Sequence, residues 1–311
     1  MKLENVFQLD AAEIAFFEKE LEKVKAKSYD VKYPERNARV IIPTSFDAGA
    51  GTEVIKYNQY DRVGMVKIIS DYAGDFERCD VKGKEFFGNV KSLGAAYGYN
   101  IQEIRASAMA NKALEQRRAN ATRQAFLDGE HYLALFGDED FNLQGFFTNP
   151  NVPEFTVPND GAGASTLWDD KTADQIIRDI NMCIRYPYVN TKGVEQSTNM
   201  LLLPQKHYAL IETMPRSTHS DTTILEFVKK VNPGLTVIGM WELDADQNDE
   251  IDSSFMFAYE CNPDKVTLEI PVEFEQFPPQ AKALEYVVHC HQRFGGVIWY
   301  YPFSAAKADG I

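Results

Sequence analysis

The chain has 311 residues, of which 44% are hydrophobic and 25% charged, and its formal net charge is −14 at pH 7. This length exceeds the ~250 to 300 residues that a single core usually serves, so we expect two lobes. No apolar run approaches the ~18 residues of a membrane helix, and the start LENVFQLDAAE lacks the features of a secretory signal. We therefore expect a soluble protein of cytoplasmic origin.

Acidic residues are concentrated late in the chain. From Glu242 to Glu275 there are eleven acids and one base, Lys265. A protein that grips nucleic acid through its phosphates needs the opposite charge, so the composition argues against a DNA-binding surface. The cysteines contain no CxxC pair, which argues against a disulfide framework and a zinc site. They are Cys79, Cys183, Cys261 and Cys290.

The first 43 residues divide into a helix and an arm. Asp10 and Glu13 resemble a capping box, and the apolar positions that follow predict a helix to about Lys27. Its stripe is narrow, which suits a helix that lies on the surface of its own chain or of a neighbour. The stripe consists of Ile14, Phe17, Leu21 and Val24. Ser28 to Pro43 shows no helical period and predicts an extended arm.

The stretch from Glu53 to Lys91 predicts a long β-hairpin with its turn near Gly74 and Asp75. Glycines and alternating charges leave it little apolar surface, and a two-stranded ribbon is not stable alone in water. Either the core of its own chain or a neighbouring subunit must cover it. The candidate contact residues, in the hairpin and in the N-terminal helix, are Tyr72, Phe76, Arg78, Phe86, Phe87, Ile14, Phe17 and Leu21.

The residues from Lys112 to Gly137 predict one long helix, because no proline interrupts a run of good helix formers. Its ~25 residues span roughly 37 Å at ~1.5 Å per residue. A shorter helical segment, Ile101 to Ala110, precedes it. The residues that we expect on one packed face are Leu114, Ala121, Ala125, Tyr132 and Phe136.

A loop-rich passage after this helix leads to alternating helices and strands, which predict a second, α/β lobe. The expected elements are a helix from Thr172 to Tyr186, strands at NMLLLP and LTVIGM, and helices at Lys206 to Thr213 and Thr222 to Lys230. Alternation from Val266 to Phe274 then predicts a half-buried strand, and ALEYVVHCH and GGVIWYYPF predict two more.

The sequence contains no P-loop, dinucleotide fingerprint, HExxH or GxSxG motif. Oxygen-bearing side chains at alternate positions from Asp244 to Asp252 imitate a calcium loop, but Asp249 stands where glycine is needed and Phe255 where the bidentate Glu is needed. A solvated acidic loop is the favoured interpretation. His289 and His291 share one face of a predicted strand, without a third ligand beside them, so ordinary strand histidines are favoured. We predict no catalytic, cofactor or metal site.

Five segments in order resemble the major capsid proteins of tailed bacteriophages with the Hong Kong 97 fold, and the resemblance covers nearly the whole chain. They are RRANATRQAFLDGEHYLALFGD, GFFTNPNV, TLWDDKTADQIIRDIN, SDTTILEFVKK and TLEIPVEFEQFPPQAKALEYVVHCHQRFGGVIWYYPFSAAKADGI. The resemblance implies an α+β fold with an N-terminal arm (1–36), peripheral strands (37–60), an extended loop (61–92), a peripheral domain (93–164) with a spine helix (112–137), an axial α/β domain (165–262), returning peripheral strands (263–292) and an axial C-terminal segment (293–311).

The resemblance also implies a function without catalysis or cofactor. Such proteins assemble as pentamers and hexamers into an icosahedral shell, part of the virion, that encloses double-stranded DNA without reading its sequence. The resemblance further implies assembly in the bacterial cytoplasm, a portal protein as a partner, and no association with a membrane. Met1 stands directly before the arm, so we expect any scaffolding protein, like a decoration protein, to be separate. Two alternatives remain: an encapsulin-like compartment, and a metal-dependent enzyme that uses the Asp244 to Asp252 loop and the two strand histidines.

Overall fold

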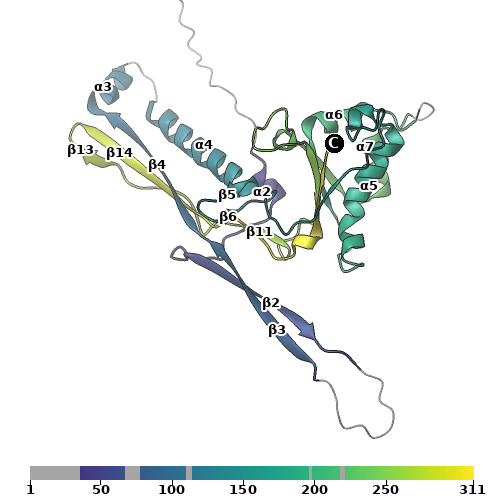
Figure 1. The fold of residues 1–311 in the computed structure, drawn as a ribbon. Coiled ribbons are helices and arrows are strands. Elements are labelled where there is room, and N and C mark those ends of the chain that lie inside the picture. The colour runs from purple at the N-terminus through teal and green to yellow at the C-terminus, as the bar shows by residue number, and fades with distance from the viewer. Residues whose placement is uncertain (1–35, 67–77, 110–113, 196–197, 218–220) are drawn as a thin grey trace, which may run out of the picture. The chain divides into compact units, whose positions relative to one another are not determined.

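A computed structural model describes residues 36–66, 78–109, 114–195, 198–217 and 221–311 of the chain (Figure 1). The chain divides into two units, Met1–Glu35 and Arg36–Ile311, and the described residues all belong to the second. The predicted N-terminal helix, with Ile14, Phe17 and Leu21, therefore lies outside the described residues. So do Tyr72 and Phe76 of the predicted hairpin.

A mixed five-stranded sheet forms the centre of one lobe. Its order is β7 (Glu154–Thr156), β16 (Ala305–Asp309), β10 (Phe255–Tyr259), β8 (Met200–Pro204) and β9 (Thr236–Met240). Every residue of β8 and β10 is buried, because alternate side chains face two different cores. Leu202 belongs to one core and its neighbour Leu201 to the other. Burial on both faces explains why these strands are continuous apolar runs.

Three helices pack against this sheet: α5 (Ala173–Asn190), α6 (Gln205–Thr213) and α7 (Ile224–Val231). α5 contacts β10 and β16, while α6 contacts β8 and β9. α5 begins at a capping box, in which the Thr172 N–H donates to Gln175 Oε1 at 2.8 Å. It continues past Pro187 to Asn190, beyond the predicted end at Tyr186. The predicted alternation of strands and helices is otherwise confirmed.

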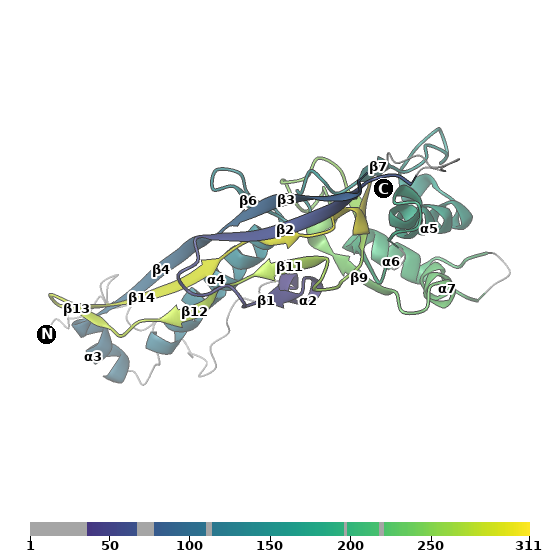
Figure 2. The same cartoon turned by 90° about the horizontal axis from the view of Figure 1, so that it is seen from below.

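A second sheet is built around a long antiparallel pair, β4 (Lys91–Asn100) and β14 (Glu285–Phe294), which pair over their full length. Two short strands, β12 (Val272–Gln276) and β13 (Gln280–Lys282), pair with the other edge of β14. Helix α3 (Ile101–Met109) follows β4, and the long helix α4 (Leu114–Leu135) then returns along this sheet (Figure 2). The Phe126 ring of α4 meets Phe274 edge-on with ring centroids 5.0 Å apart.

The buried face of α4 differs from the predicted one. Ala121, Ala125 and Tyr132, which we expected to be packed, are exposed, whereas Phe136 is half-buried against the core as predicted and the Leu114 side chain lies outside what the structure describes. The buried positions are Phe126, Glu130, His131, Ala134 and Leu135. The prediction was wrong because Glu130 and His131 are polar side chains that are buried with partners, and an apolar stripe does not reveal such residues.

Two further predictions are corrected. A short helix, α2 (Ala38–Ile41), interrupts the stretch predicted as extended, and Ile41 is fully buried. The alternating segment is two strands, β11 (Val266–Glu269) and β12, separated around Pro271. All of β11 is buried, because it lies between β1 (Thr44–Ser45) and β15 (Val297–Trp299). The expected half-buried strand is therefore wrong for its first half.

An aromatic core joins the two lobes. The Phe146 ring stacks on Trp299 with centroids 5.1 Å apart and lies 5.0 Å from Phe257 of β10. The same core contains Leu135 of α4 and Leu268 of β11. Five short elements also belong to the described fold: β5 (Gly137–Asp138), β6 (Leu143–Gln144), and the 3-10 helices Trp168–Asp170, Trp241–Leu243 and Pro302–Ser304. Within the described part of the chain, no helix has the length and apolar character of a bilayer span.

The predicted hairpin is present as a two-stranded ribbon, β2 (Val54–Val63) and β3 (Asp80–Asn89). Its strands pair from Val54 opposite Asn89 to Val63 opposite Asp80. Among the described strands no other joins this pair, and Figure 1 shows it projecting from the other sheets.

Candidate functional site

The ribbon has an anchored base and an exposed outer part. Val90 N–H donates to the Glu53 carbonyl at 2.9 Å and closes the base. Gly88 approaches β15 so closely that a Cβ there would lie 3.1 Å from Ile298 Cδ1. Glycine at position 88 therefore permits the contact between ribbon and body.

Tyr57 makes the principal side-chain contacts of the base. Its ring stacks on Phe86 at 5.1 Å and meets Tyr300 edge-on at 5.0 Å. Its hydroxyl donates to the Trp299 carbonyl at 3.2 Å. Burial, with a smaller contribution from Tyr300, raises the pKa of Tyr57 above its ordinary value, so the hydroxyl stays a donor at neutral pH.

The ribbon exposes large apolar side chains. In its outer part Tyr60 is 69% exposed and Val81 58%, and Phe87, one position closer to the body than Phe86, is also 58% exposed. Lys56 Nζ lies 5.0 Å from the centroid of the Phe87 ring, a cation–π distance that leaves the ring on the surface. Apolar area of this kind on a thin ribbon is typical of a protein–protein contact.

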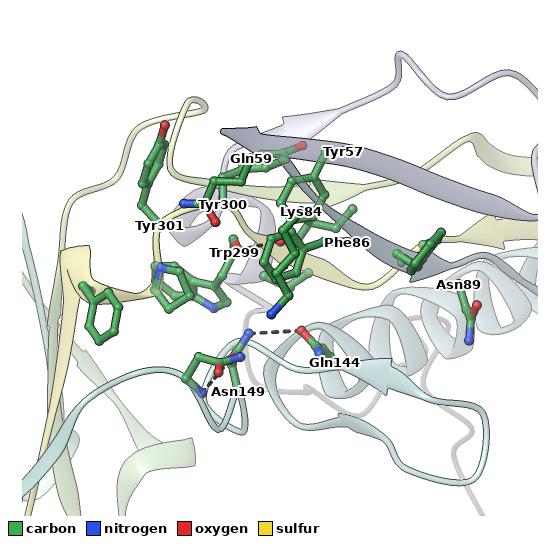
Figure 3. A pocket seen from close by; sticks show the side chains of 18 of the residues that line it. Tyr57, Gln59, Lys84, Phe86, Asn89, Gln144, Asn149, Trp299, Tyr300 and Tyr301 are labelled. Atoms are coloured by element: carbon green, nitrogen blue, oxygen red, sulfur yellow. Dashed lines mark hydrogen bonds between the residues drawn. The ribbon is translucent and has the colours of Figure 1, made fainter. Parts of the chain in front are cut away.

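A cavity of about 460 Å³ lies under the ribbon base. Tyr57, Lys84 and Phe86 line it from the ribbon, and Gln144 and Asn149 line it from the loop opposite (Figure 3). Asn149 Nδ2 donates to Gln144 Oε1 at 3.1 Å, which stabilises that loop. The lining is aromatic and amide-rich, without a cluster of charge.

The predicted contact residues fall into three groups. Phe86 faces Tyr57 within its own chain, whereas Phe87 and Arg78 are exposed. The remaining five, in the turn and in the N-terminal helix, lie outside the described residues. As inter-subunit contacts all eight stay predictions.

Buried polar pairs hold α4 in place, and sequence reasoning missed them. Arg39 donates to both carboxylate oxygens of Glu130, at 2.5 and 2.8 Å, and Gln292 Nε2 donates to Glu130 Oε2 at 2.6 Å. The hydrogen bond to Glu130 is the largest cause that raises the pKa of Arg39. His131 Nε2 lies 2.6 Å from Glu242 Oε1, with both side chains buried. The sequence shows only that Glu130 and His131 are adjacent polar residues inside a long helix, and this does not identify the residues that they contact.

The comparisons with known proteins decide the family. A model of a family described as "Major capsid protein" matches residues 64–311. The chain belongs to the major capsid protein family. A comparison with curated proteins found no match.

Solved capsid structures share the fold of this major capsid protein. The capsid of Myoviridae phage XM1 has a TM-score of 0.82 at 13% identity, over 94% of this chain and 98% of that chain. The capsid of a native GTA particle has a TM-score of 0.62 at 12% identity, over 97% and 99%. A virus-like particle from Pyrococcus furiosus has a TM-score of 0.53 at 10% identity, over 86% and 90%. The predicted Hong Kong 97 fold is confirmed, and the family match does not favour the encapsulin-like alternative.

The calcium-like loop of the capsid protein is largely the solvated loop that we predicted, since Asp246, Asp249, Glu250 and Asp252 are exposed, and its first acid is the exception. Asp244 is 6% exposed, and its Oδ1 accepts from the Asp246 N–H at 3.2 Å and from Ser254 Oγ at 3.5 Å. Glu242 is occupied by His131. Among the described residues no group of three or more His, Cys, Asp or Glu side chains is arranged to hold a metal.

Part of the late acidic segment is paired within the described chain. Lys265 pairs with Glu260 at 2.6 Å and also with Glu195. Glu273 pairs with Arg39 at 3.1 Å, and Glu275 Oε1 lies 3.0 Å from His291 Nδ1. These pairs offset only a small part of the segment's eleven negative charges.

Proposed function

We propose that this chain is the structural subunit of the head of a tailed bacteriophage. It assembles as pentamers and hexamers into an icosahedral shell around the double-stranded genome, and it performs no catalysis. The family match supports the capsid role. The observation that carries the assembly mechanism is the ribbon, whose outer part is exposed on both strands beyond the rung of Tyr57 and Phe86.

A neighbouring copy completes this ribbon. Two strands without a covering layer are only marginally stable in water, and their unpaired edges can hydrogen-bond to strands of other chains. Closed symmetry gives every copy the same surface to offer and the same neighbour to receive it. Because each copy contacts its neighbours at several places, it leaves the shell only when all of them break, and the shell is kinetically stable.

The charge of the chain suits a wall around DNA. A net charge of −14 disfavours adhesion to phosphates, and adhesion would hinder packing and release of the genome. The shell forms in the bacterial cytoplasm with a portal and, where present, separate scaffolding or decoration proteins. A strong, salt-sensitive affinity of capsomers for duplex DNA would contradict this part of the proposal.

Electron microscopy of the purified full chain tests the assembly. We expect capsomer rings or closed shells, and particles from infected cells should contain duplex DNA rather than a cargo enzyme. Phe87→Asp replaces the exposed aromatic ring with a charge and should abolish the capsomer rings, whereas Phe87→Tyr, which keeps the aromatic surface, should retain them. A monomer that forms no rings at any concentration would contradict the proposal, and a cargo enzyme in native particles would favour the encapsulin-like alternative.

A further inference from the structure

One rung of the ribbon separates its anchored base from its exposed part. Tyr57 is the last partly buried residue of β2, and residues 58–63 are exposed. Phe86 is the first partly buried residue of β3, after residues 80–85. The two are register partners, and their rings stack with an interplanar angle of 11°. The ribbon therefore leaves the body at this pair.

The body side of this rung is buried and hydrogen-bonded. Trp299, whose carbonyl accepts the Tyr57 hydroxyl, is 2% exposed. Its indole Nε1 donates to the Phe146 carbonyl at 3.3 Å. The next N–H along the chain, that of Tyr300, donates to the Lys265 carbonyl at 2.9 Å. Tyr57 thus connects the ribbon to a main-chain atom that is fixed from two sides.

A small rotation at this rung produces a large displacement farther out. The six steps from Tyr57 to Val63 span about 20 Å at ~3.3 Å per residue, so a tilt of about 10° moves Val63 by about 3.5 Å. A shift of that size breaks side-chain contacts, which need heavy atoms within about 4.5 Å. The direction of the ribbon therefore decides which residues it meets.

Packing alone does not hold the ribbon on its inner side. The cavity of about 460 Å³ borders Tyr57 and Phe86 there (Figure 3). Space on this side permits a tilt that a filled core would prevent. The edge-on contact of Tyr57 with Tyr300 and the hydroxyl bond to the Trp299 carbonyl are then the contacts that oppose it.

We propose that Tyr57 is a positioning residue that sets the direction in which the ribbon reaches an adjoining copy. This inference rests on the proposed function, since direction matters only if a second copy receives the ribbon. Fivefold and sixfold rings place neighbouring copies at different angles. A ribbon without a defined direction should therefore yield shells of mixed size.

Distances between spin labels in the unassembled full chain test whether Tyr57 sets the direction of the ribbon, and they need no shell. Labels on the exposed Cys79 and on Tyr188→Cys of α5, in a Cys261→Ser background, report the direction of the ribbon. We expect the distance distribution to broaden about twofold in Tyr57→Ala, because the ribbon then loses both the hydroxyl bond and the ring contact of Tyr57 with the body. Tyr57→Phe, which loses only the hydroxyl bond, should broaden it less.

The matched control is Tyr286→Ala, which removes a comparable stack, that with Tyr99 at 5.8 Å, from the β4–β14 pair. It should leave the distribution narrow. Equal widths for Tyr57→Ala and Tyr286→Ala overturn the proposal. Should Tyr57→Ala fail to fold, Tyr300→Leu removes the ring contact between ribbon and body while keeping an apolar side chain, and it should also broaden the distribution.

Micrographs of the same variants without labels give the second result. Tyr57→Ala should form shells with a wider range of diameters than Tyr57→Phe, and identical diameters overturn the proposal. If the unmodified chain forms no rings, the proposed function fails, while the distance distributions still decide whether Tyr57 positions the ribbon.

Discussion

The described unit contains two antiparallel strand pairs of the same length, β2–β3 and β4–β14, each with ten paired residues per strand. The pair β4–β14 has α4 against it and β12 and β13 along its free edge. The pair β2–β3 is joined by no other described strand, and its outer residues are exposed.

The difference shows that packing by neighbouring elements, rather than the amino-acid composition of the strands, decides which strand pair is covered. β3 carries two adjacent phenylalanines, whereas β4 consists largely of small residues, yet β4 lies in the completed sheet. A strand gains stability from the surface that it buries, and β4 packs Leu93, Tyr97 and Tyr99 in one cluster with Phe126 of α4. The ribbon has the apolar side chains but lacks the cover within the described chain.

The largest expected effect on stability comes from weakening the packing of α4 against the β4–β14 sheet. Phe126 of α4 is 6% exposed and packs on Phe274, so Phe126→Ala should lower the free energy of unfolding by roughly 3 kcal/mol. Phe87→Ala, at an exposed position in the other pair, should change it by less than about 0.5 kcal/mol. Urea titrations of both variants measure this contrast. Equal losses would show that the two pairs do not differ as described.

The next effect concerns the polar contact between His131 of α4 and Glu242, which holds this helix in place. Glu242→Leu leaves the buried His131 without its partner and should cost about 1 to 3 kcal/mol of unfolding free energy. Adding His131→Phe should recover most of the loss, because two apolar groups replace the pair. A double-mutant cycle in urea measures this coupling, and strictly additive losses would show that the contact contributes nothing.

The smallest perturbation is chemical labelling of the native chain. Cys79 beside β3 is exposed, whereas Cys290 of β14 is buried, and burial raises the pKa of the Cys290 thiol. The thiolate is the reactive form, so at pH 8 Cys290 has less of it and Cys79 should react first with a disulfide reagent. Assembly into shells should slow the reaction of Cys79 with this reagent. An unchanged rate in shells would show that this end of the ribbon stays uncovered.

Sequence patterns predicted the elements whose local signals agree with their environment. The long helix, the hairpin and the α/β lobe follow from periodicity and from the absence or presence of proline and glycine. β4 was not predicted, because Gly94, Gly98 and its alanines give no strand signal. Glycine at position 98 permits a close approach of β14, since a Cβ there would lie 3.2 Å from the Tyr286 carbonyl oxygen. That contact depends on a strand far away in the sequence.

The candidate site was predictable only in part. An unsupported ribbon can be inferred from its composition, but the inward side of Phe86 and the outward side of Phe87 depend on strand register. Tyr57 was not singled out, because its partners Trp299 and Tyr300 come from the far end of the chain. The burial of Glu130 and His131 was missed for the same reason.

Amide hydrogen exchange tests most directly whether the ribbon is completed by an adjoining copy. In isolated subunits we expect the amides of β4 and β14 to exchange slowly and those of β2 and β3 rapidly, because an uncovered pair opens easily. In assembled shells the ribbon amides should become nearly as protected as those of β4 and β14. Ribbon amides that are already slow in the isolated subunit, and unchanged by assembly, would contradict the account.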